Sequence, residues 1–187
     1  MGVYTDTILT IDSENTEFVN QLFTAISPTD KPSAFAALKM KLFGKEHHDG
    51  AGLMGFLLPM PEHLEKTVSN GYSGESPEWR NWRIANWGCP HDAGLELCKK
   101  ISDQKIKMRF TSYNGDTIPG LTTAAKIHGF RFCMLYHCDH GAVGRCTESN
   151  HDDYEFPGVQ PPHDAGIPKE LIDAFDLDAV YASSLEG

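Results

Sequence analysis

The alternation of apolar and polar residues between Lys105 and Tyr113 constrains the fold of this chain more than any other feature. Ile106, Met108 and Phe110 fall on one face of a strand, because successive side chains of a strand point to opposite faces of a sheet. Such a strand needs partners and a helix to cover it. The sequence after it predicts these elements: a helix at 119–128, a strand at 130–137, a hairpin turn at 139–141 and a strand at 142–148.

The N-terminal half of the chain predicts a further strand and several helices. Residues 3–11 alternate as a strand, and Phe18, Leu22 and Ile26 then recur at the spacing of one buried helix face. Further expected elements are a helix at 33–43, a short apolar strand at 56–60 and a Trp-rich helix that begins near Ser76 and Pro77 and ends at Gly88.

Together these elements predict an α+β fold. We expect a ferredoxin-like antiparallel sheet with helices on one face, an inserted helical Trp-rich segment at about 30–90 and an acidic C-terminal helix. The 187 residues suit one domain, since a domain takes roughly 100 to 200 residues. We therefore expect a ferredoxin-like α+β domain at 1–150, followed at 151–187 by an acidic loop and the C-terminal helix.

The sequence suggests a cytoplasmic protein with reduced thiols. Its longest mostly apolar run, 53–60, is far shorter than the roughly 20 residues of a membrane-spanning helix. Residues 1–10 lack the basic and apolar parts of a secretory signal. The five cysteines are not arranged as a small disulfide framework.

The negative charge is concentrated at the C-terminal end. Residues 1–146 hold 16 acidic and 15 basic residues, whereas residues 147–187 hold 10 acidic residues and Lys169 as the one cation. A surface of this sign repels nucleic-acid phosphate and attracts basic protein surfaces. The segment is therefore either a solvated tail that aids solubility or a mimic of phosphate that occupies a partner's DNA-binding cleft. The candidate partner-binding residues are Asp152, Asp153, Glu170, Asp173, Asp176 and Asp178.

Two segments together resemble a known group of proteins. The run Phe56 to Glu62 contains a Pro-Met-Pro-Glu element, and Trp79 to Gly88 has the form W-x-x-W-R-x-x-N-W-G. With the strand at 130–137, they are similar to a family of phage- and plasmid-encoded proteins with a YubB ferredoxin-like domain, over most of residues 1–150. The signature residues are Trp79, Trp82, Arg83, Asn86, Trp87 and Gly88.

The resemblance implies a ferredoxin-like fold without an iron–sulfur cluster, an origin on a mobile element and a place in the cytoplasm of a bacterial host. The family has no established catalytic residues, so the resemblance assigns none to this chain. We expect the three tryptophans to pack in the interior rather than to form a ligand cage. Two parts depart from the family: Cys89-Pro90-His91 follows the signature, and the acidic end begins at about Thr147.

A zinc site is the main chemical alternative. His137, His140 and Cys146 lie around the expected hairpin and are residue types that bind zinc. The spacing is weak, because His137 and Cys138 would point to opposite faces of a strand and the chain has no C-x-x-C. This alternative is a zinc-binding domain or a zinc-dependent enzyme; otherwise no cofactor is expected.

Cysteine catalysis and nucleic-acid binding are weaker alternatives. Cys89, His91 and Asp92 could form a catalytic set, but Cys89 follows a helix end, where the dipole raises a thiol pKa. Ferredoxin-like sheets can bind RNA on exposed aromatics, yet residues 131–136 lack the required motif and the overall charge is acidic. A nucleic-acid-binding accessory protein thus stays an alternative, and we do not expect direct contact with nucleic acid.

The sequence favours a non-catalytic phage or plasmid accessory protein that binds a host protein. A DNA-binding or defence protein is the expected partner, blocked through the acidic surface. We expect no membrane partner, and a homodimer through a sheet edge is compatible with a small α+β domain.

Overall fold

The computed structural model describes residues 3–27, 52–68, 77–156 and 158–185 as an α+β protein with a six-stranded antiparallel sheet. The strands are β1 (Tyr4–Asp12), β2 (Gly94–Ser102), β3 (Lys105–Tyr113), β4 (Arg131–Cys138), β5 (Ala142–Thr147) and β6 (His151–Glu155). The helices are α1 (Thr16–Ile26), α3 (Leu53–Leu57), α4 (Glu62–Glu65), α5 (Glu78–Trp87), α6 (Ile118–His128), α7 (Lys169–Phe175) and α8 (Leu177–Ser184).

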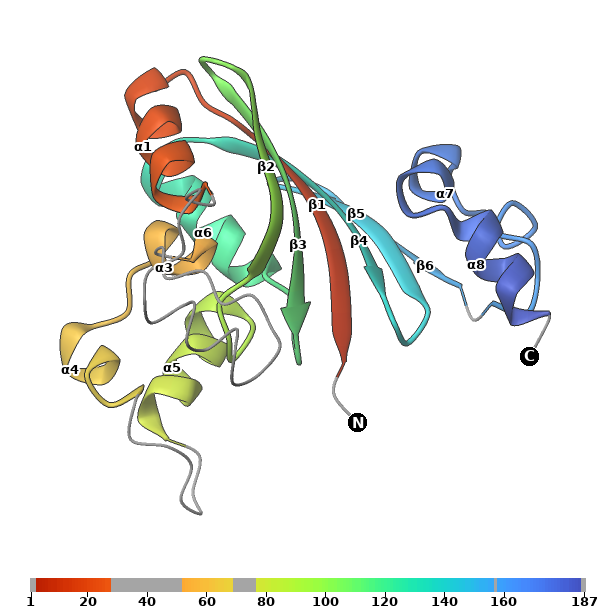
Figure 1. The fold of residues 1–187 in the computed structure, drawn as a ribbon, viewed down its shortest axis with the longest axis horizontal. Coiled ribbons are helices and arrows are strands. Elements are labelled where there is room, and N and C mark those ends of the chain that lie inside the picture. The colour runs from red at the N-terminus through yellow and green to blue at the C-terminus, as the bar shows by residue number, and fades with distance from the viewer. Residues whose placement is uncertain (1–2, 28–51, 69–76, 157, 186–187) are drawn as a thin grey trace, which may run out of the picture.

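The strand order, β2-β3-β1-β4-β5-β6, contains the ferredoxin-like arrangement that the sequence predicts. Its core runs along the chain as β1, α1, β2, β3, α6 and β4, and the strands of this unit lie in the order β2-β3-β1-β4. Strands β5 and β6 extend the sheet beyond β4. Helices α1, α3, α5 and α6 lie on one side of the sheet, as Figure 1 shows.

The central strand β1 pairs with both β3 and β4 and thereby sets the register of the sheet. Leu9 pairs with Met108 on β3 and with Met134 on β4, and none of the three side chains is exposed to solvent. The alternation seen in the sequence of β3 thus continues across the neighbouring strands. A register shift of one residue would turn all of these side chains toward the opposite face.

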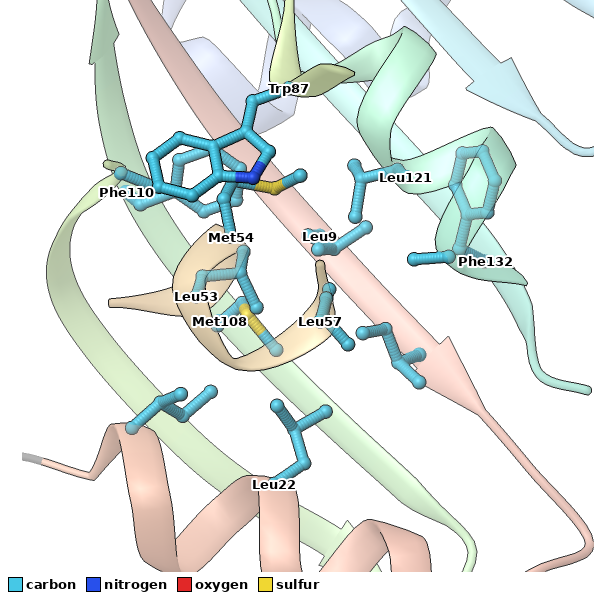
Figure 2. Close-up of a cluster of buried hydrophobic side chains, with 14 of the residues drawn as sticks. Leu9, Leu22, Leu53, Met54, Leu57, Trp87, Met108, Phe110, Leu121 and Phe132 are labelled. Carbon is cyan, nitrogen blue, oxygen red and sulfur yellow. The ribbon is translucent and has the colours of Figure 1, made fainter. Parts of the chain in front are cut away.

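A short helix replaces the expected strand at 56–60. The buried side chains between the sheet and helices α1, α3, α5 and α6 form the main core. Helix α3 contributes Leu53, Met54 and Leu57 to it, and Met54 lies beneath Trp87 of α5 (Figure 2). Their positions i, i+1 and i+4 are the spacing of one helix face. The expectation of a strand was wrong, because a short apolar run has no periodicity that separates the two structures.

Strand β2 was not predicted, because two register shifts, between Leu95 and Leu97 and between Lys100 and Ser102, interrupt its alternation. The sheet also continues to Glu155, past the boundary expected at residue 150, because β6 pairs with β5. The expected helix at 33–43 lies outside the described residues.

The acidic C-terminal helix is two short helices that pack on the opposite face of the sheet (Figure 1). Asp176 separates α7 from α8 with a left-handed backbone, φ 50° and ψ 46°. Leu171, Phe175 and Leu177 are buried against Leu135 and Val143 of the sheet. We call this second cluster the C-terminal core. In the described residues no helix is long and apolar enough to cross a membrane.

Replacing Phe175 by alanine should release the C-terminal helices from the sheet. Phe175 is 7 % exposed, and truncation of a buried phenylalanine typically costs about 3 kcal/mol or more. We expect a lower denaturation midpoint and new protease cleavage between residues 158 and 185. Val180→Ala is the control, since Val180 is 40 % exposed. Equal protease resistance of Phe175→Ala and the wild type would contradict the docked position of these helices.

Candidate functional site

The C-terminal helices carry four of the six candidate partner-binding residues in exposed positions. Glu170 on α7 lies 3.4 Å from Arg145 of β5, and Asp173 lies 2.8 Å from Lys169. Asp176 and Asp178 have no ion pair within the described part of the chain. Because the C-terminal core holds both helices, the four carboxylates occupy a defined surface rather than a random tail. We call Glu170, Asp173, Asp176 and Asp178 the acidic surface.

The other two candidate residues lie elsewhere, on strand β6. Asp152 and Asp153 are consecutive and therefore point to opposite faces of the sheet. Asp152 pairs in register with Arg145, on the face that carries α7. Asp153 lies on the other face and contacts the hydroxyl of Tyr136. The six residues consequently do not form one surface, and Asp153 lies on the opposite face of the sheet from the acidic surface.

Asp153 instead belongs to a polar cluster that sequence reasoning missed. The Tyr136 hydroxyl is within hydrogen-bonding reach of the Asp153 carboxylate and lies 2.7 Å from Nε2 of His151. Partial burial raises the pKa of Asp153, and the nearby Asp116 acts in the same direction. Gly144 makes room for the cluster, since a Cβ there would lie 2.4 Å from the Tyr136 hydroxyl oxygen. The cluster fastens the edge strand β6 to β4 across β5.

A shallow polar depression of about 350 Å³ lies on the face that carries α7 and α8. Arg109 on β3 is its central cation and donates to Asp6 of β1, while its Nε lies 3.7 Å from Glu96 of β2. Glu96 also accepts a hydrogen bond from the Thr111 hydroxyl, at 2.7 Å. These charges satisfy one another, so we assign the depression a structural role.

The predicted zinc ligands do not come together. His137 lies on the face that carries α7, where its ring contacts Phe175 at 5.8 Å, and Cys146 is buried in the main core on the opposite face. His140 lies in the turn after β4, beside Asp139. In the described ranges no group of three His, Cys, Asp or Glu side chains is placed to hold a metal ion. The hairpin zinc site is therefore wrong, because two of its ligands are separated by the sheet.

The residues Cys89, His91 and Asp92 also do not form a catalytic set. The Asp92 carboxylate accepts hydrogen bonds from the backbone N–H groups of Met54, Gly55 and Ala93, each at 2.8 Å. It thereby caps the first turn of α3, where unpaired N–H groups need acceptors. Gly52 makes this approach possible, since a Cβ there would lie 2.2 Å from the carboxyl carbon of Asp92.

The Cys89 thiol is engaged in the interior as well. It is fully buried and donates to the carbonyl oxygen of His91 at 3.1 Å. Burial raises the pKa of Cys89 to about 12, and the charges of Asp92 and Asp116 act in the same direction. The predicted direction of this pKa shift is confirmed, but burial rather than the helix dipole is its main cause. A neutral, buried thiol is a poor nucleophile.

The tryptophan signature is a packing device, as the sequence predicts. The Arg83 guanidinium stacks between the rings of Trp79 and Trp87, at 5.1 and 4.7 Å from their centroids. Trp87 also meets Trp82 edge to face and donates from Nε1 to the Leu58 carbonyl at 2.8 Å. Stacking of a guanidinium on indole rings contributes to stability most strongly where water is excluded.

The two remaining signature residues shape the helix itself. The Asn86 side chain donates to the Trp82 carbonyl oxygen at 2.8 Å, one turn earlier in α5. Gly88 ends the helix with φ 88°, a left-handed conformation that disfavours other residues. A Cβ at Gly88 would also lie 2.1 Å from the Asp116 carbonyl oxygen. The signature thus joins α5 to the turn before α6 and to the segment after α3.

Comparison with known proteins finds a similar fold but indicates no activity. No family model and no curated protein matches the chain. Its structure is similar to the crystal structure of protein api92 from Yersinia pseudotuberculosis, a DUF1281 protein, with a TM-score of 0.51 and 11 % sequence identity. The similarity covers 84 % of this chain and 99 % of the other. At this identity it shows a shared α+β fold alone.

Removal of the Asp92 carboxylate should destabilise the protein. Asp92→Ala leaves three backbone N–H groups of a buried region without their acceptor, and each such group costs roughly 1 kcal/mol or more. We expect a lower midpoint in chemical denaturation followed by circular dichroism. Asp103→Ala, at an exposed position, should leave the midpoint nearly unchanged. Equal midpoints for the two variants would show that Asp92 is not needed as a cap.

Alkylation should distinguish a buried structural thiol from a nucleophile at Cys89. At pH 8 a thiol with a pKa of about 12 holds about 1000-fold less thiolate than one at the ordinary value of 9.0. We expect iodoacetamide to modify the Cys89 peptide slowly in the native protein and rapidly in denaturant, as measured by mass spectrometry. Fast modification of Cys89 in the folded protein would restore it as a candidate nucleophile.

Proposed function

We propose that this chain is a non-catalytic accessory protein that binds a basic surface of a host protein through its acidic surface. Its origin would be a phage or a plasmid, in keeping with the sequence resemblance. The partner would be a DNA-binding or defence protein whose nucleic-acid cleft accepts carboxylates in place of phosphates. Such a partner presents lysine and arginine side chains, which steer an acidic protein toward the cleft.

The observation that carries this proposal is the docking of α7 and α8 on the sheet. Leu171 is 1 % exposed and Leu177 is fully buried, so the helices are held by apolar contacts on their inner side. The four carboxylates of the acidic surface then face outward. An ordered array of charges loses less conformational entropy on binding than a flexible acidic tail does.

The buried titratable groups support a non-catalytic role. Asp92 is engaged by three N–H groups, Cys89 is held neutral by burial, and Arg83 is stacked between indole rings. Each of these groups joins segments of the interior. Their perturbed environments are thus explained by packing, which is a common cause of shifted pKa values outside active sites.

The proposal predicts that neutralising the acidic surface weakens partner capture. The test variant is Asp173→Asn/Asp176→Asn/Asp178→Asn, which keeps the shape of each side chain and suits the left-handed position 176. Tagged protein would capture partners from bacterial lysate, and bound proteins would be eluted with rising salt and identified by mass spectrometry. We expect at least about a tenfold loss of affinity for a discrete basic partner and a weaker salt dependence.

A matched control carries the same change of net charge elsewhere. Glu14→Gln/Glu65→Gln/Glu78→Gln alters three exposed acidic residues on the other side of the sheet or at its end. This variant should capture the partner as the wild type does. If both triple variants lose the partner equally, net charge rather than the acidic surface controls binding. If neither loses it, the proposed surface is wrong.

A further inference from the structure

In the part of the chain that the structure describes, helices cover only half of the sheet face that carries α7 and α8. Helix α7 packs on β4 and β5, whereas no described helix covers the same face of β2, β3 and β1 (Figure 1). We call this area, the outward face of β2, β3 and β1, the open half-sheet. It presents apolar side chains to solvent: Leu97 is 59 % exposed and Tyr4 46 %.

The open half-sheet also carries two lysines that have no ion pair in the described part of the chain. Lys99 on β2 lies directly opposite Lys107 on β3 in the register of the sheet. Like charges in this position repel each other and destabilise a strand pair. Neither lysine has an ion pair within the described ranges, whereas the neighbouring Lys105 lies 3.0 Å from Asp12. An acidic group from outside would relieve the repulsion.

The acidic surface of the same chain has the complementary properties. It lies on the same side of the sheet and next to the open half-sheet, and it combines carboxylates with the partly exposed apolar residue Val180, 40 % exposed. Within one chain these two areas lie side by side, so they cannot cover each other. Two chains related by a two-fold axis along the strands would bring each area onto the other.

We propose that the chain forms a symmetric homodimer in which α7 and α8 of each copy cover the open half-sheet of the other. In each copy α7 and α8 rise above one half of the sheet face. The other half, the open half-sheet, is lower and can receive the helices of the second copy. A two-fold axis makes two identical contacts and closes the assembly, so no further copies are added. The contact is between sheet faces and helices, unlike the dimer through a sheet edge that the sequence suggested.

Charge favours a second copy over nucleic acid as the occupant. A strand of nucleic acid on the open half-sheet would run beside the acidic surface, which repels phosphate. The depression at the Tyr4 end of the open half-sheet is lined by Asp6, Glu96 and Asp139 as well as Arg109, which adds further negative charge beside a bound strand. The acidic helices of a second copy carry the opposite charge to Lys99 and Lys107 and, unlike phosphate, also bring an apolar side chain, Val180, to the exposed Leu97.

The oligomeric state tests this proposal directly. In sedimentation equilibrium at low salt, the wild type should have twice the 20.7 kDa mass of one chain and should dissociate as salt is added. Lys99→Glu/Lys107→Glu should be monomeric with an unchanged circular dichroism spectrum. The control, Lys66→Glu/Lys126→Glu, reverses two exposed lysines on the other side of the sheet and should remain dimeric.

A charge-swap experiment separates the proposed pairing from a general effect of charge. Asp173→Lys/Asp178→Lys should be monomeric alone, because its basic helices then meet Lys99 and Lys107. Mixed with Lys99→Glu/Lys107→Glu, it should form a heterodimer, since both contacts then join opposite charges. Failure of the mixture to associate would overturn the proposed pairing, and a wild type that is monomeric at low salt would overturn the dimer.

Two further outcomes keep this inference separate from the proposed function. Binding of a labelled single-stranded DNA oligonucleotide that is lost in Lys99→Glu/Lys107→Glu, with a monomeric wild type, would replace the second copy by nucleic acid. The same double variant retains the whole acidic surface. It should therefore capture a basic partner at least as well as the wild type, because dimerisation no longer competes for that surface.

Discussion

The burial of β4 on both faces, which begins on β1 at Ile8 and Leu9, is the constraint on which the rest of this structure depends. Leu9 of β1 packs in the main core, while Ile8, its neighbour, packs against the C-terminal core on the other side. In β4 the consecutive residues Met134 and Leu135 divide between the two cores in the same way. Two cores on one sheet need strands that are apolar on both faces, and this explains why the acidic helices can be held where they are.

Much of the fold follows from local periodicity, and the exceptions have physical causes. The alternation of β3 and the helical spacing of α1 were sufficient to place both elements, since each buries one face against the main core. Two bulges interrupt the alternation of β2, so its sequence does not indicate a strand. The helical structure of α3 depends on the distant carboxylate of Asp92. Strand β6 consists of charged and polar residues whose extended form comes from pairing with β5. Such contacts between distant segments leave no periodic signal.

The sequence predicted which residue types the candidate site contains better than it predicted where they lie. Charge counting identified the acidic residues of α7 and α8, because net charge depends on composition alone. It could not show that Asp152 and Asp153 diverge, nor that Lys99 and Lys107 meet, because these facts depend on sheet register. Asp side chains often accept hydrogen bonds from neighbouring backbone N–H groups, as Asp92 does from Ala93, but its bonds to the distant Met54 and Gly55 leave no signal in the sequence.

The irregular edge strand β2 limits how copies of this protein can associate. Its two register shifts break the regular row of backbone donors and acceptors that an incoming strand would need. A foreign β-strand therefore meets a poor template at this edge, and sheet extension into fibres is disfavoured. Polymerisation through β2 is thus disfavoured even when many copies of the chain are close together.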